Sequence, residues 1–93
     1  MDDIKLIQSI GNVAARNVEN KYRALQVKFF AIKGGGEMRV FIGEKHDTSG
    51  KTGRLYDLGE MPPQSDPIVI KSVLSLLEVR IETQVKQFLR IDA

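Results

Sequence analysis

Apolar side chains recur with a helical period near both ends of the chain and with a period of two in its middle. Residues 4–22 place an apolar residue at every third or fourth position, which predicts an amphipathic helix. The same period over residues 66–90 predicts a second, longer helix. Gly11 lies on the apolar stripe of the first helix, although glycine makes a helix less stable than alanine does. We therefore expect another element to pass close to Gly11.

The segment between the two helices alternates between apolar and polar residues, which is typical of strands. The alternation covers residues 24–32 and 37–43 and returns more weakly over 54–58. Three glycines at 34–36 separate the first two strands and predict a hairpin. The sequence therefore predicts a single α+β domain over residues 1–93, in the order α-β-β-β-α, with a three-stranded antiparallel sheet and two helices packed on one face.

One face of each predicted element is expected to join a shared hydrophobic core. The helices contribute residues at helical spacing, and the strands contribute alternate residues. The predicted core consists of Ile7, Ile10, Ala14, Val18, Leu25, Val27, Phe29, Val40, Ile42, Leu55, Val73, Leu77 and Ile81.

Length and composition narrow the class of protein. A chain of 93 residues holds one domain, which excludes a two-domain enzyme. No stretch approaches the roughly 18 consecutive apolar residues of a membrane span, and the start Met1-Asp2-Asp3 is acidic where a signal peptide is basic. We therefore expect a cytoplasmic protein without a membrane partner. The absence of cysteine excludes disulfides, thiolate nucleophiles and cysteine zinc sites.

The polar segment from 44 to 53 contains the only patterns that suggest enzyme chemistry. The run 48–52 is similar to the tail of a phosphate-binding P-loop, but Lys45 stands where that motif needs its first glycine. His46 and Asp47 are neighbours that could in principle form a general base, yet no nucleophile accompanies them. A single histidine with scattered carboxylates has no metal-ligand spacing. We expect no enzyme, no catalytic residue, no bound metal and no cofactor.

The outward face of the first two strands is the main candidate for binding a partner. It combines two aromatic residues with two cations, and the following loop adds further positive charge. The predicted partner-binding residues are Lys28, Phe30, Arg39, Phe41, Lys45, Lys51 and Arg54. Such a surface could stack against single-stranded nucleic acid, or it could be covered by a second protein or by another layer of the same protein. A net charge of +2 from 14 basic and 12 acidic residues favours the second interpretation.

The end of the second helix is a candidate for self-association. A helix of about 36 Å exceeds the ~23–31 Å span of a strand of seven to nine residues, so its last turns are expected to overhang the sheet. This predicts a homodimer, held either through the aromatic strand face or through apolar residues near the helix end. The latter are Val85, Phe88, Leu89 and Ile91.

These observations leave two classes of function open. The preferred one is a small non-enzymatic accessory or inhibitor that binds another protein, a class of size and fold that includes immunity proteins and phage-encoded inhibitors. The alternative is a nucleic-acid-binding module. Double-stranded-RNA-binding domains share the order of elements, but their second helix begins with clustered lysines, whereas Lys71 is the only lysine at its start here.

Overall fold

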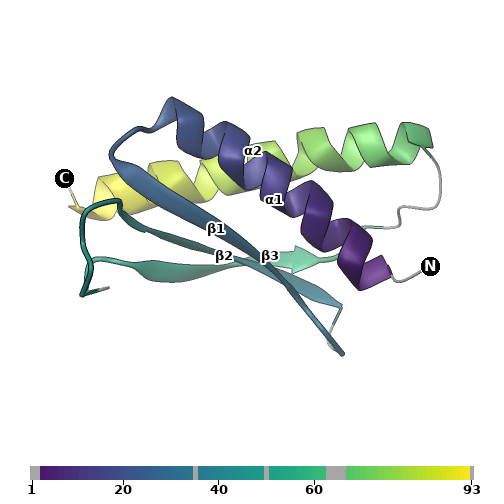
Figure 1. Ribbon diagram of the computed structural model, residues 1–93, viewed down its shortest axis with the longest axis horizontal. Helices are drawn as coiled ribbons and strands as arrows, with labels where there is room; N and C mark the ends of the chain where they lie inside the picture. The colour runs from purple at the N-terminus through teal and green to yellow at the C-terminus, as the bar shows by residue number, and fades with distance from the viewer. Residues whose placement is uncertain (1–2, 35, 50, 63–66, 93) are drawn as a thin grey trace.

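The protein is a two-layer α+β domain. Its computed structural model describes residues 3–34, 36–49, 51–62 and 67–92. The elements follow in the order α1 (Asp3–Lys21), β1 (Leu25–Ile32), β2 (Glu37–Glu44), β3 (Arg54–Glu60) and α2 (Pro67–Asp92). Both helices lie on the same side of the sheet (Figure 1). The predicted fold is therefore confirmed, with boundaries within two residues of those expected wherever residues are described.

The sheet is an antiparallel meander in the order β1-β2-β3. A tight turn joins β1 to β2, and Gly34 and Gly36 adopt φ values of 88° and 66° there, which only glycine reaches without strain. The register places Phe30 opposite Arg39 and Phe41 opposite Leu55. Between β2 and β3 the register shifts at Met38/Arg39, so β3 changes its pairing near its end.

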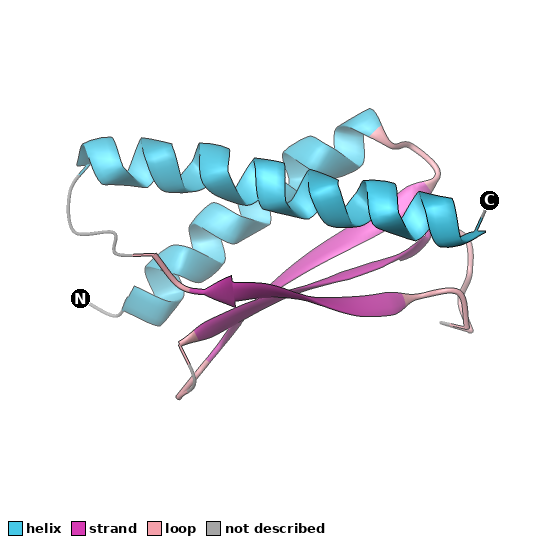
Figure 2. Cartoon of the chain, turned by 180° about the vertical axis from the view of Figure 1, so that it is seen from behind, coloured by secondary structure: helices cyan, strands magenta, loops and turns pink. Residues whose placement is uncertain are grey.

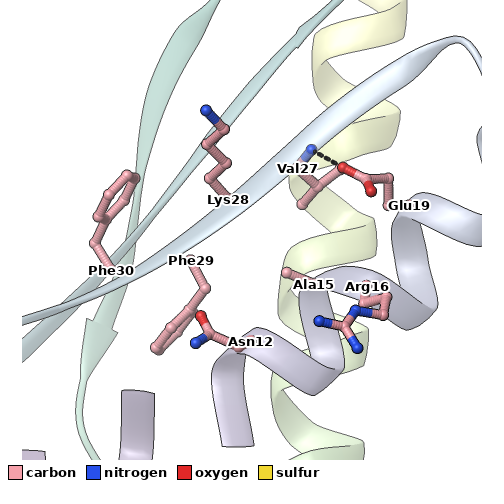
Figure 3. A pocket seen from close by; sticks show the side chains of 8 residues that line it. All are labelled: Asn12, Ala15, Arg16, Glu19, Val27, Lys28, Phe29 and Phe30. Atoms are coloured by element: carbon pink, nitrogen blue, oxygen red, sulfur yellow. Dashed lines mark hydrogen bonds between the residues drawn. The ribbon is translucent and has the colours of Figure 1, made fainter. Parts of the chain in front are cut away.

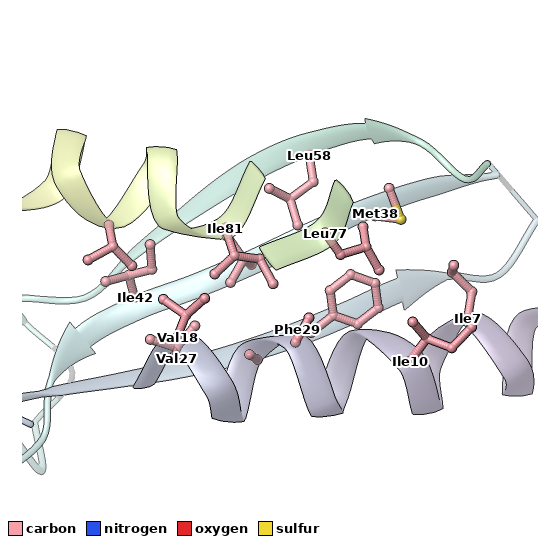
Figure 4. Packing of buried hydrophobic residues seen from close by; sticks show 14 of the residues in the cluster. Ile7, Ile10, Val18, Val27, Phe29, Met38, Ile42, Leu58, Leu77 and Ile81 are labelled. Atoms are coloured by element: carbon pink, nitrogen blue, oxygen red, sulfur yellow. The ribbon is translucent and has the colours of Figure 1, made fainter. Parts of the chain in front are cut away.

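The hydrophobic core fills the space between the sheet and the two helices (Figure 4). Every residue predicted for the core is buried except Leu55. The ring of Phe29 packs so tightly against Gly11 that a methyl group on this glycine would overlap it. The expectation of a close approach at Gly11 is therefore confirmed, and the passing element is β1.

The prediction that Leu55 belongs to the core is wrong, since its side chain is 55% exposed. β3 carries apolar residues on both of its faces. Leu55 lies opposite Phe41, on the side away from the helices, whereas Leu58 is buried among the core residues. The alternation was correct, but the wrong face of this short strand was assigned to the core. The sequence analysis also missed Ala15 and Met38, which are buried as well.

The expected overhang of the second helix is also wrong. Val85 and Phe88 are fully buried in the core, so neither side chain is available to a second molecule. The prediction compared the length of the helix with the length of the strands only. The end of α1 also lies against α2, where the Tyr22 hydroxyl donates a hydrogen bond of 2.8 Å to Glu82. Of the four residues predicted to mediate self-association in this region, Val85 and Phe88 are buried and Leu89 is 39% exposed. Ile91 has no described side chain.

Candidate functional site

The face of the sheet that points away from the helices, here called the outer face, is not covered by any described element (Figures 1 and 2). Two rows of side chains cross it. One row runs from Lys28 through Phe41 to Leu55, and the other places Phe30 opposite Arg39. The structure therefore brings the four strand residues that were predicted to bind a partner onto one surface.

The centre of the outer face is apolar and concave. Phe30 is 41% exposed, and Leu55 is more exposed still. Together with Ile32 and Arg39 they line an open hollow of about 260 Å³. Leu55 is the residue that sequence reasoning missed here. The sequence contained a sign of this position, because Leu55 and Asp57 are two residues apart and therefore share one face of β3.

Charges of both signs surround this apolar centre. Arg39 lies 3.9 Å from the carboxylate of Glu37 and directly opposite Asp57 on β3. Lys28 is exposed on β1. Because two carboxylates accompany the central arginine, the outer face is an apolar surface with a mixed rim and has no continuous cationic stripe.

Phe41 differs from Phe30 although both belong to the outer face. The Phe41 ring lies over Gly43 and Gly53, and a methyl group on Gly53 would overlap it. Phe41 is only partly exposed as a result. The lack of a side chain on these two glycines leaves room for the Phe41 ring close to the backbone, and Phe30 is the more exposed of the two rings.

The remaining predicted cations do not join this surface. The Lys45 amide donates a hydrogen bond of 2.8 Å to the Ala24 carbonyl, which places Lys45 at the start of β1, far along the strand from Phe30. Lys51 lies in the β2–β3 connection. Arg54 is paired with Ile42, whose side chain is on the helix side of the sheet. The seven predicted residues therefore do not all lie on one surface.

The β2–β3 connection is organised around Asp47. One carboxylate oxygen accepts hydrogen bonds from the amide and hydroxyl of Ser49, and the other accepts from the amide and hydroxyl of Thr52. The Ser49 hydroxyl and the Thr52 groups hold the pKa of Asp47 well below its usual range. Because these four bonds engage both oxygens, the carboxylate is not directed at His46 as a general-base pair would require.

A groove of about 400 Å³ lies between α1 and the edge of β1 that faces away from β2 (Figure 3). The Gln8 amide spans the edge, donating to the Phe29 carbonyl and accepting from the Ala31 amide, both at 2.8 Å. Glu19 accepts a hydrogen bond from the Val27 amide, also at 2.8 Å. Side chains of α1 thus bond the backbone groups of β1 that a neighbouring strand would use. The sequence analysis did not predict this contact.

The described parts of the chain add two observations. No group of three or more histidine, aspartate or glutamate residues among them is arranged to hold a metal ion. None of the described helices is long and apolar enough to cross a membrane.

Comparisons with known proteins add no family. The chain matches no protein-family model, and no curated protein or solved structure is significantly similar to it.

Proposed function

We propose that the protein is a small non-enzymatic accessory or inhibitor that acts in the cytoplasm and binds another protein through the outer face of its sheet. The observation that supports this proposal most is the exposed apolar hollow formed by Phe30, Ile32 and Leu55 beside Arg39. Protein interfaces combine such a centre of aromatic, aliphatic and arginine side chains with a polar rim. Glu37, Lys28 and Asp57 supply that rim.

The same surface is less suited to nucleic acid. A stacking site needs open aromatic rings, and the Phe41 ring is only partly exposed and lies close to Gly53. A phosphate site needs cations that are free of carboxylates, and Arg39 has Glu37 beside it. These features favour the protein-binding function over the nucleic-acid-binding alternative.

Affinity capture from the organism that encodes the chain tests the proposal, with and without nuclease treatment. We expect a retained protein that survives nuclease, followed by a measured dissociation constant for the two purified proteins. Phe30→Glu should weaken this affinity about 30-fold or more, as loss of a central aromatic contact of about 2 kcal/mol does. Leu89→Glu is a matched control, because Leu89 is exposed to nearly the same extent on a different surface.

Two outcomes would contradict this proposal. Equal loss of affinity in both variants would mean that the outer face is not the contact surface. Retention that nuclease removes, and that Lys28→Glu with Arg39→Glu abolishes, would instead support the nucleic-acid-binding alternative. In that case affinity should fall steeply with salt, by ~0.7 log units per phosphate contact for each tenfold rise in salt on single strands.

A further inference from the structure

The two edges of the sheet differ in whether side chains of the helices bond their backbone groups. At the β1 edge, the amides of Val27 and Ala31 point away from β2 and are bonded by Glu19 and Gln8 of α1. Since the direction of backbone groups alternates along a strand, Lys28 and Phe30 bond β2. The register of the sheet extends this alternation to β3. There, the backbone amides and carbonyls of Arg54 and Tyr56 point toward β2.

The backbone groups of Leu55 and Asp57 therefore point away from the sheet, at the β3 edge. Among the described residues, no side chain bonds the main-chain amide or carbonyl of either residue. α2 bonds the backbone of this strand further along, where the Arg80 guanidinium donates a hydrogen bond of 3.2 Å to the Leu58 carbonyl. The β3 edge is thus an open pairing site between Arg54 and Asp57, whereas the β1 edge is occupied.

We propose that a second copy of this chain pairs with the β3 edge, strand against strand and antiparallel, about a two-fold axis perpendicular to the sheet. The result is a homodimer with one sheet running through both copies. This proposal does not depend on the function assigned to the outer face. It moves the self-association surface away from the end of α2, where the predicted residues Val85 and Phe88 are buried.

The charges around β3 favour a second copy as the partner. Lys51 and Arg54 precede or begin the strand, and Asp57 and Glu60 lie toward its end. An antiparallel copy brings the basic start of each strand beside the acidic end of the other. A parallel copy would instead bring like charges together. Arg54 lies on the helix side and Asp57 on the outer face, so this attraction acts between the ends of the two strands, not between paired side chains, and it favours the antiparallel direction.

An exposed stripe of α2 supports the same arrangement. Val79 lines a hollow with Asp57 and Leu58 of β3, so this part of α2 lies beside the β3 edge, as Figure 2 also shows. Val79 is 64% exposed, and Leu76, one turn earlier, is 37% exposed. A two-fold axis perpendicular to the sheet keeps both helix layers on one side. The apolar stripe of α2 would then face its copy, which covers these two side chains.

The irregular end of β3 limits how far the two strands overlap. The register shift and the φ of 87° at Gly59 bend the strand after Asp57. The regular edge therefore runs from Arg54 to Asp57, and the two-fold axis lies close to Leu55 and Tyr56. Registers that place Asp57 opposite its own copy are disfavoured because like charges would meet.

Sedimentation equilibrium of the purified chain, with paired charge-swap variants, tests the proposal. The native protein should show twice the chain mass of 10.4 kDa. Lys51→Glu with Arg54→Glu makes the segment wholly acidic, and Asp57→Lys with Glu60→Lys makes it wholly basic. Each variant alone should be monomeric, and an equimolar mixture should regain the dimer mass. Recovery on mixing separates a lost contact from a misfolded variant.

Cross-linking locates the contact, because the chain has no cysteine of its own. We expect Leu55→Cys to form a covalent dimer under mild oxidation at least ten times faster than Leu89→Cys, its control at the end of α2. A native protein that stays monomeric at high micromolar concentration overturns the proposal. So does a dimer that both charge-swap variants retain, or one that cross-links faster through the position of Leu89. None of these results bears on the affinity of the outer face for another protein.

Discussion

Phe29 and Phe30 are neighbours in the sequence but lie in opposite environments. Phe29 faces the helices, is 3% exposed and packs its ring onto Gly11. Phe30 faces away from the helices and is 41% exposed beside Arg39 and Leu55. Successive side chains of a strand point to opposite faces of the sheet. One phenylalanine therefore lies in the core, and the next lies on a surface that a partner can reach.

This contrast shows that hydrophobicity alone does not separate residues for stability from residues for binding. The helix side of the sheet is filled at close distances, so a change of volume there must be felt. The outer face carries aromatic and aliphatic side chains that nothing in the described structure covers. Burial therefore separates the residues that stabilise the fold from those that are free to bind a partner, and measurements of stability can test this separation.

The largest expected effect comes from truncating the two phenylalanines in turn. Phe29→Ala should lower the free energy of unfolding by about 3–5 kcal/mol, because it leaves a cavity in a packed core. Phe30→Ala should change it by less than about 0.5 kcal/mol, as is usual for an exposed site. Urea unfolding followed by circular dichroism measures both values. Similar losses in the two variants would show that the outer face is also packed in solution.

Gly11 provides a smaller test of the helix side. Gly11→Ala should destabilise the protein by about 2 kcal/mol, although alanine favours a helix, because the new methyl group overlaps the Phe29 ring. The shorter side chain in Phe29→Leu should relieve this clash. A double-mutant cycle of the two substitutions should therefore show strong coupling. Additive effects would contradict the close contact between α1 and β1.

The two edges of the sheet extend the comparison. Gln8→Ala should cost about 1.5 kcal/mol, since it leaves the Phe29 carbonyl and the Ala31 amide without their partner. It should also open the β1 edge, so sedimentation of the variant should show new, larger species. Gln87→Ala is the control, because Gln87 is exposed on α2. Unchanged stability and mass in Gln8→Ala would mean that α1 does not protect this edge.

Much of the fold followed from periodicity, and the misses have specific physical causes. Leu55 and Leu58 both lie on a short strand whose two faces each carry apolar residues, so alternation alone could not choose the buried one. Phe88 was expected to project beyond the sheet because helix length was compared with strand length only. Packing of α2 against the end of α1 depends on tertiary geometry that no local pattern contains.

The candidate site was predictable only in part for the same reason. Strand alternation correctly put Phe30 and Arg39 on one face, since their pairing follows from a simple hairpin. The separation of Arg54 from that face depends on the register of β3, which pairs Arg54 with Ile42. The role of Gln8 at the β1 edge requires knowledge of which strand α1 crosses, and this appears only in the assembled structure.

The smallest expected effect concerns the β2–β3 connection. Hydrogen bonds to a charged carboxylate stabilise this connection, whereas apolar packing stabilises the helix side of the sheet. The folded protein holds the pKa of Asp47 below its unfolded value of ~3.9, mainly through the Ser49 hydroxyl and the Thr52 groups. Folding therefore favours the ionised carboxylate. The stabilisation is complete above the unfolded pKa and is lost as pH falls below about 4 toward the folded pKa.

Asp47→Asn isolates this contribution, because asparagine keeps the shape of the side chain but cannot ionise. The difference in free energy of unfolding between the native protein and the variant should stay constant from about pH 7 to 5 and shrink below about pH 4. Urea unfolding at each pH measures it, and Thr48→Ala, an exposed neighbour, should give a difference that does not change with pH. A difference for Asp47→Asn that grows as pH falls would reverse the sign expected from its hydrogen bonds. The pH dependence of this connection would then have to come from a group other than Asp47.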